Sequence, residues 1–131
     1  LRHVLEQTYP RIRIARILEN HDAEFESYTL TRQLLEEYPH LDAVFFAAAG
    51  VYGGCRAIRE SRCHPKVITF DEVPTTLEML KDGIISATIS QQPVRQGSRS
   101  LDILFEYLTS GILPEQEQNF VELSIKIREN I

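Results

Sequence analysis

Residues 66–93, KVITFDEVPTTLEMLKDGIISATISQQP, contain a complete strand, helix and strand. The β-branched and aromatic run at residues 67–70 is typical of a strand that is buried on both faces of a parallel sheet. Pro74 suits the first helical position, and Gly83 predicts the end of the helix before a second strand at residues 84–89. Two parallel strands joined in this way end at the same edge of their sheet.

A polar side chain follows each of these two strands. Asp71 comes directly after the first strand, and Gln91 comes after the second. Because open α/β sheets bind ligands at the carboxyl ends of their strands, both are candidate ligand contacts, and we expect them to converge on one cleft. The alternative roles are local: Asp71 as a helix N-cap or turn former, and Gln91 as a loop amide bonded to the backbone.

The composition is that of a globular domain. The 131 residues are 43% hydrophobic and 25% charged, so neither disorder nor a membrane span is indicated. A net charge of -5 argues against nucleic-acid binding by this segment itself. Cys55 and Cys63 are too few for a disulfide framework and are typical of reduced intracellular thiols.

The sequence predicts neither a metal site nor a catalytic one. The neighbours Cys63 and His64 lack a second ligand pair at a recognised spacing, so we expect no metal and no cofactor. An enzyme could use Cys55, His64 and Asp71 as nucleophile, base and orienting group. Since no motif frames these three residues, we expect a protein that is not an enzyme and has no catalytic residues.

Predicted helices and strands alternate along the rest of the chain. Strands are expected where apolar residues are contiguous or alternate, and helices where they recur every three to four residues. This alternation places the chain in the α/β class. The predicted elements are a helix ending before Pro10, a strand at 12–18, a helix at 24–38, a strand at 43–46, a helix from 51, a helix at 94–110 and a strand at 121–128.

Two loops between these elements are candidate parts of a site. Asn20, His21 and Asp22 follow the predicted strand at 12–18, and they either cap the next helix or present side chains to a ligand. Residues 47–50, Ala-Ala-Ala-Gly, are small enough for a ligand or another backbone to approach closely. The alternative for this second loop is a tight strand-to-helix crossing.

Four stretches, in this order and spacing, resemble the effector-binding region of lac-repressor-type (LacI/GalR) transcription regulators and their relatives, the periplasmic sugar-binding proteins. The resemblance implies a type I periplasmic-binding-protein-like fold: two α/β lobes joined by three crossings, each with a mostly parallel sheet and helices on both faces. The stretches are PHLDAVFFAAAGVYGGCRAI (39–58), VITFDEVP (67–74), GIISATISQQPVRQGSRSLDIL (83–104) and IKIREN (125–130).

The resemblance makes this chain a partial fragment of such a protein. Residues 1–131 would form part of the effector-binding domain, mainly its C-terminal lobe, with residues 94–119 belonging to the other lobe. In the resembled fold, the first strand of the lobe lies between the strands at 12–18 and 43–46, and it precedes Leu1. Because unpaired backbone groups inside a sheet are costly, we expect this slot to be filled. The candidates are the strand at 121–128, a strand from a second copy, or residues upstream of Leu1, which we favour.

The resemblance also assigns roles to single residues. Asp71 matches the aspartate that bonds ligand hydroxyls, and Gln91 matches the glutamine of a crossover. Asn20 and Asp22 fall near the loop after the second strand of the lobe. Ala48 lies in an Ala-Ala pair where the family commonly has Asn-Asp, which removes a polar contact. The implied ligand is a sugar or sugar derivative.

The expected function is that of the effector-binding part of a cytoplasmic transcription regulator. The terminal REN sequence and the two cysteines favour this reading. The implied partners are a sugar-like effector, operator DNA bound through a domain absent from this chain, and a second copy in a homodimer, with no membrane. The effector would act by shifting the population towards a closed arrangement of the lobes. The alternative is a periplasmic sugar-binding protein of an ABC transporter, whose full gene would encode a signal sequence.

Overall fold

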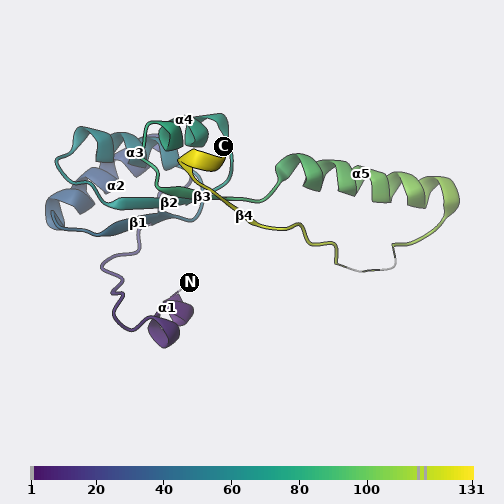
Figure 1. Ribbon diagram of the computed structural model, residues 1–131, viewed down its shortest axis with the longest axis horizontal. Coiled ribbons are helices and arrows are strands. Elements are labelled where there is room, and N and C mark those ends of the chain that lie inside the picture. Colours follow the sequence, from purple (N-terminus) through teal and green to yellow (C-terminus); the bar gives the residue numbers. More distant parts are fainter. Residues whose placement is uncertain (1, 115, 117) are drawn as a thin grey trace.

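The computed structural model describes residues 2–114, 116 and 118–131 (Figure 1). Helices and strands alternate in it, which confirms the predicted α/β class. The elements are α1 (Arg2–Thr8), α2 (Glu24–Glu37), β1 (Ala43–Phe46), α3 (Val51–Glu60), β2 (Lys66–Phe70), α4 (Pro74–Lys81), β3 (Ala87–Ser90), α5 (Pro93–Ser110), β4 (Ser124–Lys126) and the 3-10 helix η1 (Arg128–Asn130).

The described strands form one mostly parallel sheet in the order β1-β2-β3-β4. β1 and β3 both pair with β2 in parallel, whereas β4 runs antiparallel to β3. The register pairs Phe46 with Thr69, and Phe70 with Ile89. The carboxyl ends of the three parallel strands are therefore nearly level, and the loops that follow them lie at one edge of the sheet.

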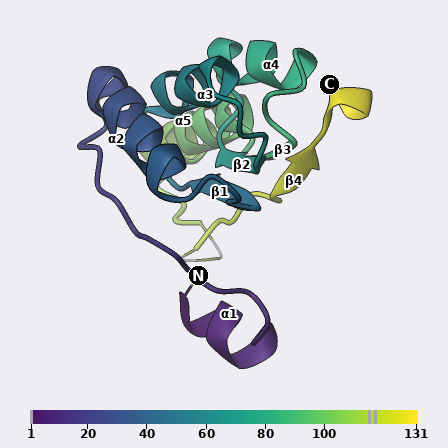
Figure 2. The same cartoon turned by 90° about the vertical axis from the view of Figure 1, so that its left-hand side faces the viewer.

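Helices α2, α3 and α4 cover one face of the sheet (Figure 2). The core between these helices and the strands includes Cys55, Val67 and Leu80, each 0% exposed. On the other face, Phe45 is 37% exposed and Ile68 is 39% exposed. The prediction that residues 67–70 are buried on both faces is wrong, because no described helix packs on this second face.

Two glycines allow α3 to pack closely against its neighbours. A Cβ atom on Gly53 would lie 1.9 Å from the carbonyl oxygen of Glu24 in α2, and one on Gly54 would lie 2.3 Å from the ring of Phe46. Side chains at these positions would force the elements apart, since contacts this short are not tolerated in a packed core. The Gly-Gly pair thus sets the distance between α3, α2 and β1.

Helix α5 extends away from the rest of the fold, and the chain then returns to the sheet as β4 (Figure 1). None of the described residues of α5 is buried. The predicted strand at 121–128 is shorter than expected at both ends. At its C-terminal end, the Asn130 side chain bonds the Ile127 amide and the Ile125 carbonyl group, and the chain turns into η1. The outgoing and returning segments meet where Gln92 Nε2 donates a 3.0 Å hydrogen bond to the Glu122 carbonyl oxygen.

Residues 12–18 do not form the predicted strand and have no regular structure. A strand requires a paired neighbour, and β1 lies at the edge of the described sheet without a partner on its outer side. Between this segment and β1 lies a largely apolar groove of about 600 Å³, lined by residues that include Ile14, Ile17 and Phe45. The groove lies where the resemblance places the first strand of the lobe, between residues 12–18 and β1.

The strand at 121–128 is excluded as the occupant of this slot, since β4 pairs with β3 at the opposite end of the sheet. The other two candidates, a strand from a second copy and upstream residues, remain predictions.

We predict that Gly53→Ala lowers the free energy of unfolding by about 2–3 kcal/mol, because the added methyl group overpacks the α2–α3 contact. The matched control is Gly97→Ala in α5, where an added Cβ meets nothing within 4 Å. This control should leave stability unchanged or raise it slightly, because alanine favours helix more than glycine does. Urea unfolding of the two variants measures the difference. Equal effects would contradict the packing role of Gly53.

Candidate functional site

The loops at the carboxyl edge of the sheet contain all four non-glycine residues with positive φ in the described chain. His21 (48°) and Asp22 (58°) precede α2, Asp71 (73°) follows β2, and Gln92 (50°) follows β3. The left-handed region is costly for residues with a Cβ atom, and such residues cluster at binding and active sites. The backbone therefore points to this edge as the candidate site.

Asp71 and Gln91 meet at this edge, as the sequence predicts, and the cleft on which they were expected to converge stays a prediction. Gln91 Nε2 donates a 2.7 Å hydrogen bond to Asp71 Oδ1. Asp71 is exposed, Gln91 is half-buried, and the Asp71 amide donates to the Ile89 carbonyl oxygen across the β2–β3 pair at 3.0 Å. Asp71 does not cap α4, whose N-cap is Val73 with no side-chain bond. The N-cap alternative for Asp71 is therefore wrong, whereas its left-handed φ directly after β2 agrees with the turn-former alternative. The Gln91 amide bonds a side chain and not the backbone, as its alternative had it.

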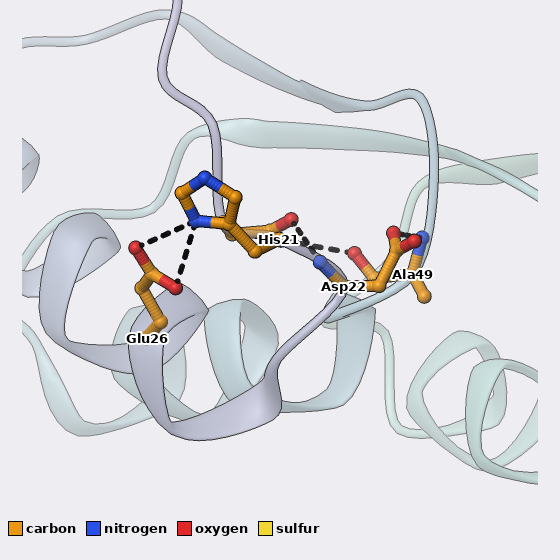
Figure 3. Close-up of polar contacts among 5 residues, drawn as sticks. His21, Asp22, Glu26 and Ala49 are labelled. Atoms are coloured by element: carbon orange, nitrogen blue, oxygen red, sulfur yellow. Dashed lines mark hydrogen bonds and ion pairs between the residues drawn. The ribbon is translucent and has the colours of Figure 1, made fainter.

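Asn20 and Asp22 hold the loop that follows β1. Figure 3 shows Asp22 beside Ala49 of this loop. Asn20 Nδ2 donates to the Ala49 carbonyl oxygen at 2.9 Å, and the Ala49 amide donates to Asp22 Oδ1 at 3.2 Å. The Asp22 amide in turn donates to Asn20 Oδ1 at 3.2 Å. Neither side chain caps α2, whose N-cap is Ala23 without a side-chain bond. The capping alternative is wrong, and the two residues instead fix the backbone of Ala49.

Ala48 is exposed and lies in the loop that follows β1. Asn20, Asp22 and Ala48 line the groove beside β1, whereas Asp71 and Gln91 lie outside it, farther along the same edge. The structure thus brings four of the five predicted residues together as two hydrogen-bonded pairs, Asn20 with Asp22 and Asp71 with Gln91, and Ala48 lines the groove beside the first pair. A carboxylate and an amide at such an edge can bond a hydroxyl-bearing ligand, because together they donate and accept hydrogen bonds.

Residues 1–112 match the family described as periplasmic binding protein domain, which is most of the chain. The chain belongs to this family. The family-level part of the sequence resemblance is thereby confirmed. Among curated protein sequences, none matches the chain significantly.

Solved structures of sugar-binding proteins have a similar fold. The sugar-binding protein of a sugar ABC transporter from Bacillus halodurans is 30% identical over 98% of this chain and 48% of that chain, with a TM-score of 0.81. The arabinose-binding protein AraP from Geobacillus stearothermophilus is 26% identical over 98% and 47%, with a TM-score of 0.83. The glucose-galactose-binding protein GanP of the same organism, 21% identical over 95% and 45% with a TM-score of 0.83, shows the fold alone.

This periplasmic-binding-protein chain spans about half the length of these three structures. AraP is described as an arabinose-binding protein and GanP as a glucose-galactose-binding protein. The protein from Bacillus halodurans is described as the sugar-binding protein of a sugar ABC transporter. None of the three is described as a transcription regulator, so that part of the sequence interpretation stays a prediction.

Cys55, the nucleophile that an enzyme of this sequence would use, is unsuited to catalysis. Cys55 is 0% exposed, and burial, with a smaller contribution from the charge of Glu24, raises the pKa of its thiol to about 12. A catalytic cysteine requires a lowered pKa.

Within the described residues, no group of His, Cys, Asp and Glu side chains is arranged to hold a metal ion. Nor is any described helix both long and apolar enough to cross a membrane.

Gln92 is not among the site residues predicted from the sequence. Its positive φ turns the chain from β3 into α5, and its side chain donates to the Glu122 carbonyl oxygen in the returning segment. The sequence feature that points to Gln92 is a second glutamine directly before Pro93. A long polar side chain at the end of a strand can bond a neighbouring segment of the chain.

We predict that Asp22→Ala speeds hydrogen exchange of the Ala49 amide about tenfold or more, because the amide loses a hydrogen bond to a charged group. Glu26→Ala is the control: it removes only the exposed pair that Glu26 forms with His21 Nδ1 at 3.1 Å. Exchange measured residue by residue by NMR distinguishes the two variants. An unchanged Ala49 rate in Asp22→Ala would show that the loop does not depend on this contact.

Proposed function

We propose that this chain forms most of one lobe of a two-lobed protein that binds a sugar between its lobes and delivers it to an ABC transporter. The observation that carries the proposal is the Asp71 carboxylate 2.7 Å from the Gln91 amide at the carboxyl edge of the sheet. Such edges are where α/β folds bind ligands. The transport role is supported by the 30% identity to a transporter's sugar-binding protein over 98% of the chain.

Each residue of the proposed site has a distinct role. The Asp71 carboxylate accepts hydrogen bonds from sugar hydroxyls, and the Gln91 amide, which already orients Asp71, donates to a hydroxyl oxygen. Asp22 contributes its Oδ2 atom, while Asn20 keeps the Ala49 loop in place. Ala48 lets the apolar face of a sugar ring approach the backbone, because its side chain is a single methyl group.

Residues 94–119 belong to the other lobe in this proposal. The support is the course of α5, which leaves the sheet and has no buried residue in its described part. Leu101, Phe105 and Leu108 are 68%, 68% and 72% exposed along this helix. Apolar stripes of this size are normally covered by other parts of a protein. The other lobe would cover them and close the cleft over the ligand, and the ligand would favour the closed arrangement.

A regulator of the LacI type is the second candidate. It is favoured by Cys55 and Cys63, which are both free thiols, as is usual in the reducing cytoplasm. In this case the sugar would change the affinity of a homodimer for operator DNA, bound through a domain outside this chain. Crosslinking the protein to chromosomal DNA in cells tests the choice. Enrichment at one site would favour the regulator, and export of the protein would favour transport.

Asp71→Ala in the intact protein should weaken sugar binding by about 1.5–3 kcal/mol, which is roughly 10- to 150-fold, because the ligand loses hydrogen bonds to a charged group. Calorimetric titration with D-glucose, D-galactose and L-arabinose measures the loss on whichever sugar binds. Asp82→Ala at the end of α4 makes the same charge change away from the site and should leave the affinity unchanged. Wild-type affinity in Asp71→Ala would refute the proposed site.

A further inference from the structure

Two hydroxyl side chains face the helices from β3, where aliphatic side chains would be expected. Thr88 is 0% exposed and Ser90 is 1% exposed. A buried hydroxyl costs free energy unless it forms a hydrogen bond, so its partner indicates what it does. Both hydroxyls bond the turn that follows β2, which contains Asp71.

Thr88 Oγ1 donates a 2.7 Å hydrogen bond to the Asp71 carbonyl oxygen and lies 3.4 Å from the carbonyl oxygen of Thr69. A hydroxyl has one proton to donate, and the shorter contact is the better hydrogen bond. Ser90 Oγ donates to Glu72 Oε2, the next residue of the turn. β3 thus bonds this turn through backbone and side chains together.

The conformation of Asp71 requires such support. Its φ of 73° lies in the left-handed region, which costs a non-glycine residue free energy that surrounding contacts must offset. The backbone of Asp71 is bonded to β3 on both sides, by its amide to Ile89 and by its carbonyl group to Thr88. In this conformation its carboxylate lies beside Gln91.

We propose that Thr88 is a positioning residue for ligand binding. Its buried hydroxyl holds the Asp71 backbone in the left-handed conformation that brings the carboxylate beside Gln91, ready to bond a hydroxyl of the ligand. The inference rests on the proposed function, because it assumes that Asp71 contacts the sugar. It adds a residue that does not touch the ligand and acts only through Asp71.

The structure supplies an isosteric control. Thr76 Oγ1 in α4 is also buried, and no described group forms a hydrogen bond with it. Thr76→Val and Thr88→Val therefore make the same change of hydroxyl to methyl in buried sites, but only the second removes a hydrogen bond to Asp71. A general effect of removing a buried hydroxyl would occur in both variants.

The test measures the affinity of the intact protein for D-glucose, D-galactose or L-arabinose by calorimetry, together with urea unfolding. Thr88→Val should weaken binding about three- to tenfold, the worth of one hydrogen bond. Thr88→Ser, which keeps the hydroxyl, should stay within about twofold of wild type, and so should Thr76→Val. In the Asp71→Ala background, Thr88→Val should cause no further loss, because the two residues act as one unit.

The outcomes separate the inference from the proposed function. Wild-type affinity in Asp71→Ala refutes the proposed function itself. A loss in Asp71→Ala with wild-type affinity in Thr88→Val overturns the role of Thr88 alone. Equal losses in Thr88→Ser and Thr88→Val, an equal loss in Thr76→Val, or additive losses in the double variant overturn it as well. If Thr88→Val does not fold, Thr88→Cys, with a weak donor of similar size, carries the same expectation.

Discussion

The parallel pairing of β1, β2 and β3 is the constraint on which the candidate site depends. Because the register levels the carboxyl ends of these strands, residues far apart in the sequence meet at one edge. The hydrogen bond between Asp71 and Gln91 crosses 20 positions in the chain, and the one between Asn20 and Ala49 crosses 29. A slip of one residue in the β2–β3 pairing would turn the side chains of the slipped strand to the opposite face of the sheet and change how Asp71 meets Gln91.

The two edges of the sheet differ in what completes them. At one end, β4 returns from α5 and closes the sheet beside β3. At the other end, β1 has no partner within the described chain, and the groove between it and residues 12–18 is apolar. The Gly53–Glu24 contact keeps α2 and α3 in place above this open edge, so the core is intact although the sheet is not completed there.

Much of the fold follows from local sequence patterns. The predicted boundaries of β1 are those of the structure, and α2 and α5 differ from their predicted limits by one residue. The meeting of Asp71 and Gln91 could be predicted because parallel strands joined by a helix end at the same edge of their sheet. These features depend on periodicity and topology, both of which are encoded within short stretches.

The predictions that were wrong share one cause, because each of them depends on contacts with residues far away in the sequence. Residues 12–18 have the alternation of a strand, but a strand forms only beside another strand, and the pattern does not reveal whether one is present. Asn20 and Asp22 have the residue types of helix caps, yet their partner is Ala49, which no local rule predicts. Thr88 looks like an ordinary β-branched strand residue, and only its contact with Asp71 distinguishes it.

A crystal structure of the intact protein with the sugar that it binds most tightly would show directly whether Asp71 and Gln91 contact the ligand. We expect sugar hydroxyls within hydrogen-bonding distance of both the Asp71 carboxylate and the Gln91 amide, at the carboxyl edge of β2 and β3. A sugar bound in the groove beside β1, with Asp71 and Gln91 bonded only to one another, would contradict this expectation.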